Sequence, residues 1–463
     1  MFKKSNLSPF VLISGLMFMA MVLSACQPAA TPAPTTAAAA PTTAAAAPTT
    51  APAATSTKLV VASFYPLDQV SGWDGMLAKF KQDHPGVEVE VQVTPFDQYM
   101  PKLLTQIAGG DAPDVVGVEN TPFPQFVQEN MLLDLNPLLA KTEGFSTKDF
   151  FPNLLDRYTY NGEVYGIPYD AQPFAMLFYN PKLFDEAGVA YPTDQWTWND
   201  ARDAAKKLTK IDASGAVTQY GLVIPFTGSP TGETTMIYAW NGRYVDDLRN
   251  PTKSMLDQQA AIDGVQFLVD MMYKDKSVIT PATLESLGGT ADVDMFTSGK
   301  VAMMYGGFWS AVENPVGFNK IGAKVVMGPT GPDGNRLYAT GGTAYSILKS
   351  SKNQELAWEF IQYFLGQVGY QEAFRASTLG AMYPPAHIPS FNWYLTQKVG
   401  YIDTIQPDED ALKYVIFAPY ALNWQEISDK CITPDMSLVL QNLKPVAETM
   451  KGMSTCVNGM LNK

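Results

Sequence analysis

The hydrophobic pattern between residues 59 and 118 changes its period four times, and no other feature limits the possible fold as strongly. Continuous apolar runs or period-two alternation predict strands, whereas apolar residues spaced three and four apart predict helices with one buried face. A succession of strand, helix, strand, helix and strand predicts a parallel sheet with helices on both faces. The five predicted elements cover residues 59–64, 73–80, 87–93, 99–108 and 114–118.

The remaining chain continues this mixture of elements over a length that one core does not usually hold. The chain has 463 residues, so we expect two lobes. A turn cluster at residues 328–334 suits a connection between them. We predict an α/β fold in which each lobe is a mainly parallel sheet flanked by helices. Lobe 1 is expected to comprise residues 58–168 plus 328–378, and lobe 2 residues 169–327 plus 379–463.

The charge balance excludes one class of partner. The chain has 32 Lys and Arg residues against 45 Asp and Glu residues, and its net charge is -13. Binding to nucleic acid requires a basic surface that neutralises phosphates, so a nucleic-acid partner is not expected. Adsorption to anionic lipid is disfavoured for the same reason.

The amino terminus has the features of a secretory signal. Lys3 and Lys4 precede an apolar stretch at residues 10–23, which is short for a permanent membrane span. The following sequence Leu23-Ser24-Ala25-Cys26 resembles the bacterial lipobox. That resemblance implies that residues 1–25 are a lipoprotein signal peptide and that Cys26 carries the lipid. The alternative is an ordinary secretory signal with an incidental cysteine. We expect an extracytoplasmic protein anchored to the cell membrane, on a face that the sequence does not identify.

Residues 26–57 form a low-complexity segment between this signal and the predicted fold. After Gln27 the segment is almost wholly Ala, Pro and Thr and carries no charge before Lys58. It cannot form a packed core, and its proline content favours an extended spacer. We interpret it as a linker that lets the anchored domain reach away from the membrane.

Two further cysteines stand near the carboxyl terminus. Cys431 and Cys456 form a lone pair in a chain with secretory features. Such a pair more often forms a disulfide than a metal site, and two free thiols are the alternative.

Motifs for catalysis, metal binding and cofactor binding are absent. The two histidines, His84 and His387, lie in a turn and after a Pro-Pro pair, with no metal-ligand spacing. No phosphate-binding loop or nucleophile elbow occurs, so we expect no cofactor, no metal and no enzymatic activity. A glycosidase that uses two carboxylates stays open, because such pairs are assembled only in the folded chain.

An ordered set of segments resembles the family 1 extracellular solute-binding proteins, the maltose-binding-like components of bacterial ATP-binding cassette sugar importers. The order matters more than any one segment, and the resemblance extends from residue 59 to residue 385. The tail beyond residue 385 departs from the pattern. The matching segments are residues 102–115, 165–168, 178–184, 197–200, 296–303, 307–309, 341–342 and 350–360.

The resemblance implies a periplasmic-binding-protein-like fold of the class II type. Its two lobes are joined by crossing strands, and the ligand is held in a hinged cleft between them. Closure on the ligand creates the form that the importer's membrane permease subunits recognise, and the importer hydrolyses the ATP. The resemblance therefore implies a monomeric binding protein that captures a mono- or oligosaccharide and delivers it to an importer.

Aromatic side chains that stack on a sugar ring are the first candidates for the site. Trp309 matches the position of the family's sugar-stacking tryptophan, with core packing as the alternative. Trp240 and Trp424 are further candidates on chemical grounds. Phe64 and Tyr65 end the first predicted strand, where side chains are expected to enter the cleft.

Polar candidates follow the predicted strands. Glu119 ends the third strand, and Asp170 and Gln172 follow the crossing strand; surface or hinge roles are the alternatives. Gly341 and Gly342 would let the backbone approach a ligand closely. Arginines are scarce around these segments, which argues against an anionic ligand. A polyamine held by acids and aromatics is the alternative ligand, and a structural surface lipoprotein is the most distant alternative.

Overall fold

The computed structural model describes residues 56–65, 72–224, 231–288 and 291–461. The predicted signal peptide, the lipidation site at Cys26 and all but the last two residues of the predicted linker lie outside the described residues. Thr57, the last residue of the predicted linker, is the first residue of the first strand. Among the described helices, none combines the length and apolar character that crossing a membrane requires.

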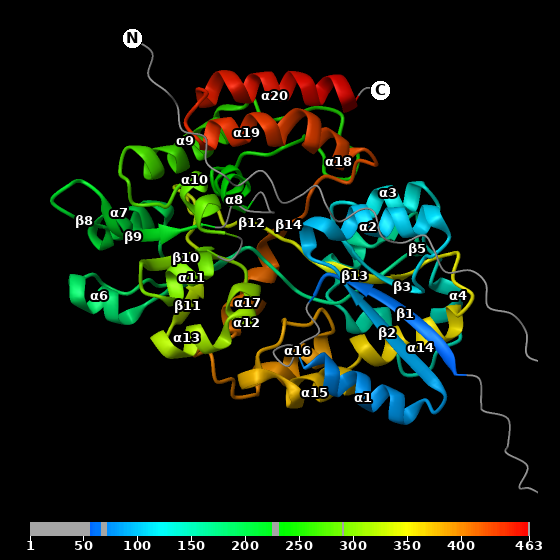
Figure 1. The fold of residues 1–463 in the computed structure, drawn as a ribbon. Helices are drawn as coiled ribbons and strands as arrows, with labels where there is room; N and C mark the ends of the chain where they lie inside the picture. Colours follow the sequence, from blue (N-terminus) through cyan, green and yellow to red (C-terminus); the bar gives the residue numbers. More distant parts are fainter. Residues whose placement is uncertain (1–55, 66–71, 225–230, 289–290, 462–463) are drawn as a thin grey trace, which may run out of the picture. The chain divides into compact units, whose positions relative to one another are not determined.

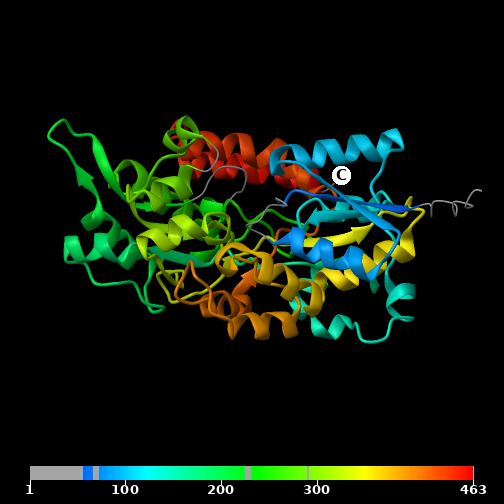
Figure 2. The same cartoon turned by 60° about the horizontal axis from the view of Figure 1, so that its bottom comes forward.

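The first sheet contains the βαβαβ unit that the sequence predicts. β1 pairs in parallel with β2 and β3, and α1 and α2 connect them. Figures 1 and 2 show α2 on one face of this sheet and α1 with α14 on the other. The strands in spatial order are β2 (Val87–Val93), β1 (Thr57–Ser63), β3 (Val115–Glu119), β13 (Thr343–Ile347) and β6 (Ile167–Pro168). The helices and hairpin strands are α1 (Trp73–Asp83), α2 (Phe96–Gly109), α3 (Phe123–Gln128), α4 (Asn136–Leu139), α5 (Pro152–Arg157), β4 (Thr159–Tyr160), β5 (Glu163–Val164), α14 (Gln354–Leu365) and α15 (Gln367–Ala376).

The second sheet is built from the middle of the chain. Its strands in spatial order are β11 (Lys324–Met327), β7 (Met176–Tyr179), β10 (Val301–Gly306), β9 (Val217–Val223) and β8 (Lys210–Ile211). Its helices are α6 (Pro181–Ala187), α7 (Trp198–Leu208), α8 (Thr231–Ala239), α9 (Gln259–Tyr273), α10 (Pro281–Leu287), α11 (Ala291–Thr297), α12 (Trp309–Glu313) and α13 (Pro315–Ile321). Thr197 and Asp200 form a capping box at the start of α7, as their spacing predicts.

Strand direction differs from the prediction in one respect. The sheets are mixed rather than mainly parallel: β13 runs antiparallel to β3 and β6, and β7 runs antiparallel to both β10 and β11. The reason is that β7 and β13 belong to chain segments that pass from one sheet to the other. A strand that follows a helix crossover within one sheet enters the sheet at the same end as the strand before it and runs parallel to it. A strand that comes from the other sheet enters at the opposite end and therefore runs antiparallel.

The tail after residue 379 contacts both sheet assemblies. α16 (Ile388–Leu395) packs against α15, and α17 (Gln406–Ala411) packs against β11. α18 (Trp424–Ile427), α19 (Thr433–Leu440) and α20 (Val446–Leu461) form a group in which α20 packs against α9 (Figure 1). Within this group a disulfide joins Cys431 to Cys456. α16 thus contacts a helix of the first sheet assembly, whereas α17 and α20 contact elements of the second.

Gly221 in β9 fixes the distance between the second sheet and α7. A Cβ atom at this position would lie 2.1 Å from the carbonyl oxygen of Ala205 and 2.4 Å from its Cα. Because both atoms are backbone, neither can rotate away. We expect Gly221→Ala to lower the free energy of unfolding by about 2 kcal/mol, measured by urea denaturation. Gly452→Ala on α20 is the matched control, because its added Cβ meets nothing within 4 Å. Equal midpoints for the two variants would contradict this prediction.

Candidate functional site

Residues at one edge of the first sheet come together around Asp170. Tyr65 follows β1 and donates its hydroxyl hydrogen bond to Asp170 Oδ2. The backbone N–H of Thr343, at the start of β13, donates to Asp170 Oδ1 at 2.8 Å. The Thr343 hydroxyl lies 3.0 Å from the Tyr65 hydroxyl. The structure therefore joins two predicted site residues, Tyr65 and Asp170, in one buried network.

The environment of Asp170 favours its neutral form. The residue is 1% exposed, and burial raises the pKa of its carboxyl group to about 7. The hydrogen bonds from Tyr65 and Thr343 oppose this rise but do not cancel it. Asp170 is therefore a hydrogen-bonding centre of the crossing segments rather than a fixed negative charge.

The two glycines predicted to face a ligand accept or donate backbone hydrogen bonds, Gly342 with residues beside the first sheet and Gly341 with the other crossing segment. The carbonyl oxygen of Gly342 accepts a hydrogen bond from the Tyr158 hydroxyl at 2.6 Å and another from the Asn120 N–H at 3.1 Å. The Gly342 backbone has φ +131°, a conformation that favours glycine. Gly341 donates its N–H to the carbonyl oxygen of Gln172 at 3.2 Å. The side chain of Gln172 is buried in this same region.

Trp309 lies at the start of α12 and forms an aromatic platform with Phe174. The ring centroids are 4.9 Å apart in an edge-to-face arrangement, and both side chains are half-buried. Gly307 makes room for the indole, because a Cβ there would lie 1.3 Å from Trp309 Cζ3. A Cβ on Gly341 would similarly lie 3.2 Å from the Phe174 ring. We call Phe174 and Trp309 the aromatic platform.

Glu119 ends β3, as predicted, and two hydrogen bonds fix the orientation of its carboxylate. Asn120 Nδ2 donates to Oε1 at 2.6 Å, and the Thr121 N–H donates to Oε2 at 2.9 Å. Burial raises the pKa of Glu119, while these hydrogen bonds lower it. The half-buried carboxylate is a preoriented acceptor at the carboxyl end of a parallel strand, where ligands of α/β folds bind.

The arrangement of these elements agrees with the comparisons with known proteins. A family model for bacterial extracellular solute-binding proteins matches residues 66–370. The chain belongs to this family. The arabinooligosaccharide-binding protein of Halalkalibacterium halodurans is 26% identical over 291 residues, which cover 61% of this chain and 60% of that relative. The protein of the same name from Bacillus subtilis is 28% identical over 308 residues, covering 63% of this chain and 65% of the relative. Both matches thus span less than two thirds of the relative.

Solved structures confirm the fold class of this solute-binding protein. An ABC substrate-binding protein from Listeria monocytogenes, in complex with cycloalternan, has a TM-score of 0.77 at 23% identity, covering 88% of this chain and 99% of that chain. A maltose-bound protein of T. maritima has a TM-score of 0.71 at 20% identity, covering 87% of this chain and 99% of that chain. The predicted maltose-binding-like, two-lobed fold is confirmed.

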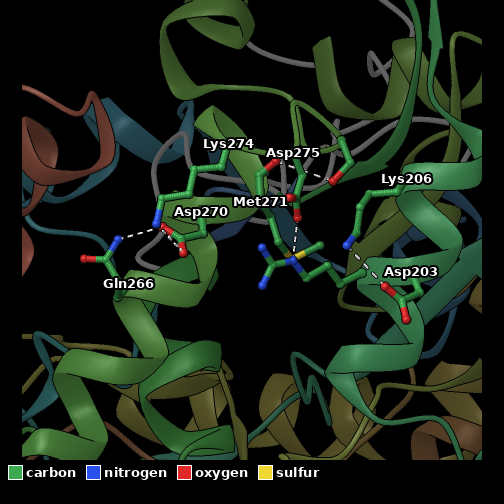
Figure 3. Close-up of polar contacts among 9 residues, drawn as sticks. Asp203, Lys206, Gln266, Asp270, Met271, Lys274 and Asp275 are labelled. Atoms are coloured by element: carbon green, nitrogen blue, oxygen red, sulfur yellow. Dashed lines mark hydrogen bonds and ion pairs between the residues drawn. The ribbon is translucent and has the colours of Figure 1, made fainter.

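Trp240 of the solute-binding protein lies at the end of α8 and packs against a helix. Its ring centroid is 4.5 Å from that of Phe267 on α9. The guanidinium of Arg202 on α7 lies 5.0 Å from the centroid of the Phe267 ring. Arg202 also forms an ion pair with Asp275. Figure 3 shows this polar surface of α7 and α9, with the Asp203–Lys206 and Asp270–Lys274 pairs beside Asp275. The position of Trp240 fits helix packing.

Trp424 and Phe64, the other predicted aromatic residues, lie in different surroundings. Trp424 is 5% exposed and packs among the C-terminal helices, with its ring 6.2 Å from that of Tyr244. This is the environment of a residue in the hydrophobic core. Phe64 is half-buried after β1, and its ring lies 5.1 Å from that of Phe96, which is 50% exposed. Phe64 thus keeps an accessible aromatic neighbour at the carboxyl end of the first sheet.

Sequence reasoning missed two residues of this region. Phe174 follows Pro173 immediately after the predicted pair Asp170 and Gln172, and that proximity was the available signal. Arg157 is the second, an arginine that α5 brings to this region although the segments that carry the other site residues contain few arginines. It is 3% exposed and donates to the carbonyl oxygen of Asn120, beside Glu119. Arg157 was missed because α5 is distant in sequence from the strand end that it covers.

Among the described residues, no group of three or more His, Cys, Asp or Glu side chains is arranged to hold a metal ion. What the site provides is aromatic surface, the oriented Glu119 carboxylate and backbone groups. These are the groups that bind the C–H faces and hydroxyls of a sugar.

Proposed function

We propose that this solute-binding protein captures an uncharged carbohydrate between its two lobes and delivers it to an ATP-binding cassette importer. The observation that carries the proposal is the half-buried Trp309 indole, laid over Gly307 beside Phe174. An indole held in this way offers a flat apolar face that can stack on a sugar ring. The relatives named for arabinooligosaccharide binding support an oligosaccharide.

Hydroxyl groups of the sugar would be bound by the oriented Glu119 carboxylate and by polar groups near the crossing segments. In this proposal Phe64 contributes aromatic surface from the first sheet, and Tyr65, Asp170, Gln172, Gly341 and Gly342 shape the floor between the lobes. The buried Arg157 does not favour an anionic ligand, since its guanidinium already contacts the Asn120 carbonyl and lies close to the Glu119 carboxylate. The protein supplies binding and closure, and catalysis is not required of it.

The proposal includes the location of the protein. Residues 1–25 would direct export, Cys26 would carry the lipid anchor, and the linker would hold the binding domain away from the cell membrane. A monomer would then present its closed form to the membrane permease subunits.

A ligand panel tests this function on the full chain. The panel contains arabinooligosaccharides, maltodextrins, diacetylchitobiose, monosaccharides and spermidine, with tryptophan fluorescence and thermal shift as readouts. We expect a sugar to bind and to stabilise the fold by about 2.7 kcal/mol at a hundredfold excess over its Kd. A response to spermidine without any sugar response would identify a polyamine-binding protein instead. Hydrolysis of the bound sugar, followed by chromatography, would identify a glycosidase.

A further inference from the structure

Tyr420 connects the two sheet assemblies. Its backbone N–H donates to the carbonyl oxygen of Leu248, in the segment between α8 and α9. Its ring, however, belongs to a buried cluster with Phe123 and Tyr158, which lie beside the first sheet. The residue is 5% exposed. Tyr420 is thus fastened to one half of the molecule by its backbone and packed into the other half by its side chain.

Cationic and aromatic groups from both halves surround this ring. Arg157 from α5 lies 4.7 Å from the ring centroid, and Arg249 from the α8–α9 segment lies 5.0 Å from it. Tyr160 of β4 stacks nearly parallel to the ring, with centroids 5.7 Å apart and an angle of 13°. A guanidinium over an aromatic face is attracted by the ring's electron density.

An ion pair closes the same junction at the surface. Arg249 binds the carboxylate of Asp156 and also donates to the Asp156 carbonyl oxygen at 2.7 Å. Asp156 belongs to α5, whereas Arg249 belongs to the other half of the molecule. Both side chains are exposed, at 38% for Arg249 and 69% for Asp156, so water and salt can compete for this contact.

The junction leaves buried polar atoms without protein partners. Within the part of the chain that the structure describes, neither Arg157 Nε nor the Tyr420 hydroxyl has a hydrogen-bond partner. Unpaired buried polar groups lower the stability of an arrangement relative to one in which water reaches them. The contacts around Tyr420 therefore favour association of the halves, while the unpaired atoms keep that association reversible.

We infer that Asp156, Arg157, Tyr160, Arg249 and Tyr420 form a clasp that biases the two lobes toward their associated arrangement before any ligand is bound. The contacts of this Tyr420 clasp do not depend on the proposed function. Only their effect on ligand affinity rests on it. Its residues position the lobes and need not touch the sugar. A pre-associated arrangement would reduce the motion required for closure and so increase the apparent affinity.

Distances between spin labels in the ligand-free full chain test the clasp. Labels on Lys141→Cys and Lys182→Cys report the separation of the halves, with Cys26→Ser removing a competing thiol. Both lysines are exposed and lie on different sheet assemblies. We expect Arg249→Gln to raise the ratio of long to short distances about two- to fivefold. Exchanging the charges in Arg249→Asp with Asp156→Arg should restore part of the short-distance population.

Two matched controls separate the clasp from general effects. Arg375→Gln breaks an exposed ion pair with Glu372 inside α15 and should leave the distances unchanged. Tyr420→Phe keeps the ring and removes the unpaired hydroxyl, so its short-distance population should equal or exceed that of the parent, whereas Tyr420→Leu should shift the distances toward long values. Unchanged distances in both Arg249→Gln and Tyr420→Leu, or an equal shift in Arg375→Gln, would overturn the inference. Because no sugar is present, such a failure is distinct from failure of the ligand panel.

Discussion

Trp309→Ala is expected to weaken binding of the panel sugar about a hundredfold, which corresponds to about 2.7 kcal/mol. The reason is that the indole supplies most of the aromatic platform, and an aromatic group in a desolvated contact carries a large share of the binding energy. Isothermal calorimetry is the suitable measurement, because the substitution also removes a fluorescent reporter. The unfolding midpoint should change little, since Trp309 is only half-buried.

Gly307→Ala tests the same platform without removing the indole. The added methyl group would occupy the position of the Trp309 ring, 1.3 Å from Cζ3, so the ring must leave its place over the glycine. We expect a loss of affinity in the same direction as that of Trp309→Ala. Trp240→Ala is the control, because Trp240 packs against Phe267 on α9. Normal affinity in Trp309→Ala combined with lost affinity in Trp240→Ala would show that the wrong tryptophan was chosen.

Local elements of the fold could be predicted because each depends on residues close in sequence. The burial of Trp73, Met76 and Phe80 on α1 follows directly from their spacing. The capping box of Thr197 and Asp200 is equally local. Strand direction was predicted less well, because the orientation of β7 and β13 depends on where the chain crosses between the sheets.

The site was predictable where it follows strand ends and unpredictable where it depends on contacts between distant segments. Tyr65 and Asp170 each follow a strand of the first sheet, but only the folded chain shows that they share a hydrogen bond. The platform joins Phe174 to Trp309, across 135 positions that include most of the second sheet. Arg157 approaches Asn120 from α5. The spacing of apolar residues along the chain cannot predict a contact between segments so far apart in sequence.

The Asp170 network gives rise to the largest expected effect on stability. Asp170→Ala would leave the Tyr65 hydroxyl and the Thr343 N–H without their shared acceptor, and we expect it to lower the free energy of unfolding by about 3 kcal/mol. Asp170→Asn retains an oxygen for Thr343 and an amide group opposite Tyr65, so it should cost less. Urea denaturation of both variants gives the comparison, and equal losses would exclude the hydrogen bonds as the cause.

The pH dependence of stability provides an independent check with a definite sign. The pKa of Asp170 rises from its ordinary value of 3.8 to about 7 in the folded chain. Between these values the unfolded chain releases the proton while the folded chain keeps it. The contribution of Asp170 to stability is therefore fully present below about pH 4 and declines as the pH rises toward 7, by up to about 1.4 kcal/mol per pH unit. Asp170→Asn should remove this decline.

Asp200 supplies a control of opposite sign on the same protein. The hydrogen bonds of the capping box lower the pKa of Asp200, so its stabilising contribution is present at neutral pH and is lost as the pH falls through the lowered value. Denaturation curves recorded from pH 2 to pH 8 should therefore show the Asp170→Asn profile departing from that of the parent between pH 4 and pH 7, and the Asp200→Asn profile departing only below about pH 4. If Asp170→Asn kept the parent's pH profile, Asp170 would already be ionised in the folded chain. Its burial between the crossing segments would then need another compensating charge.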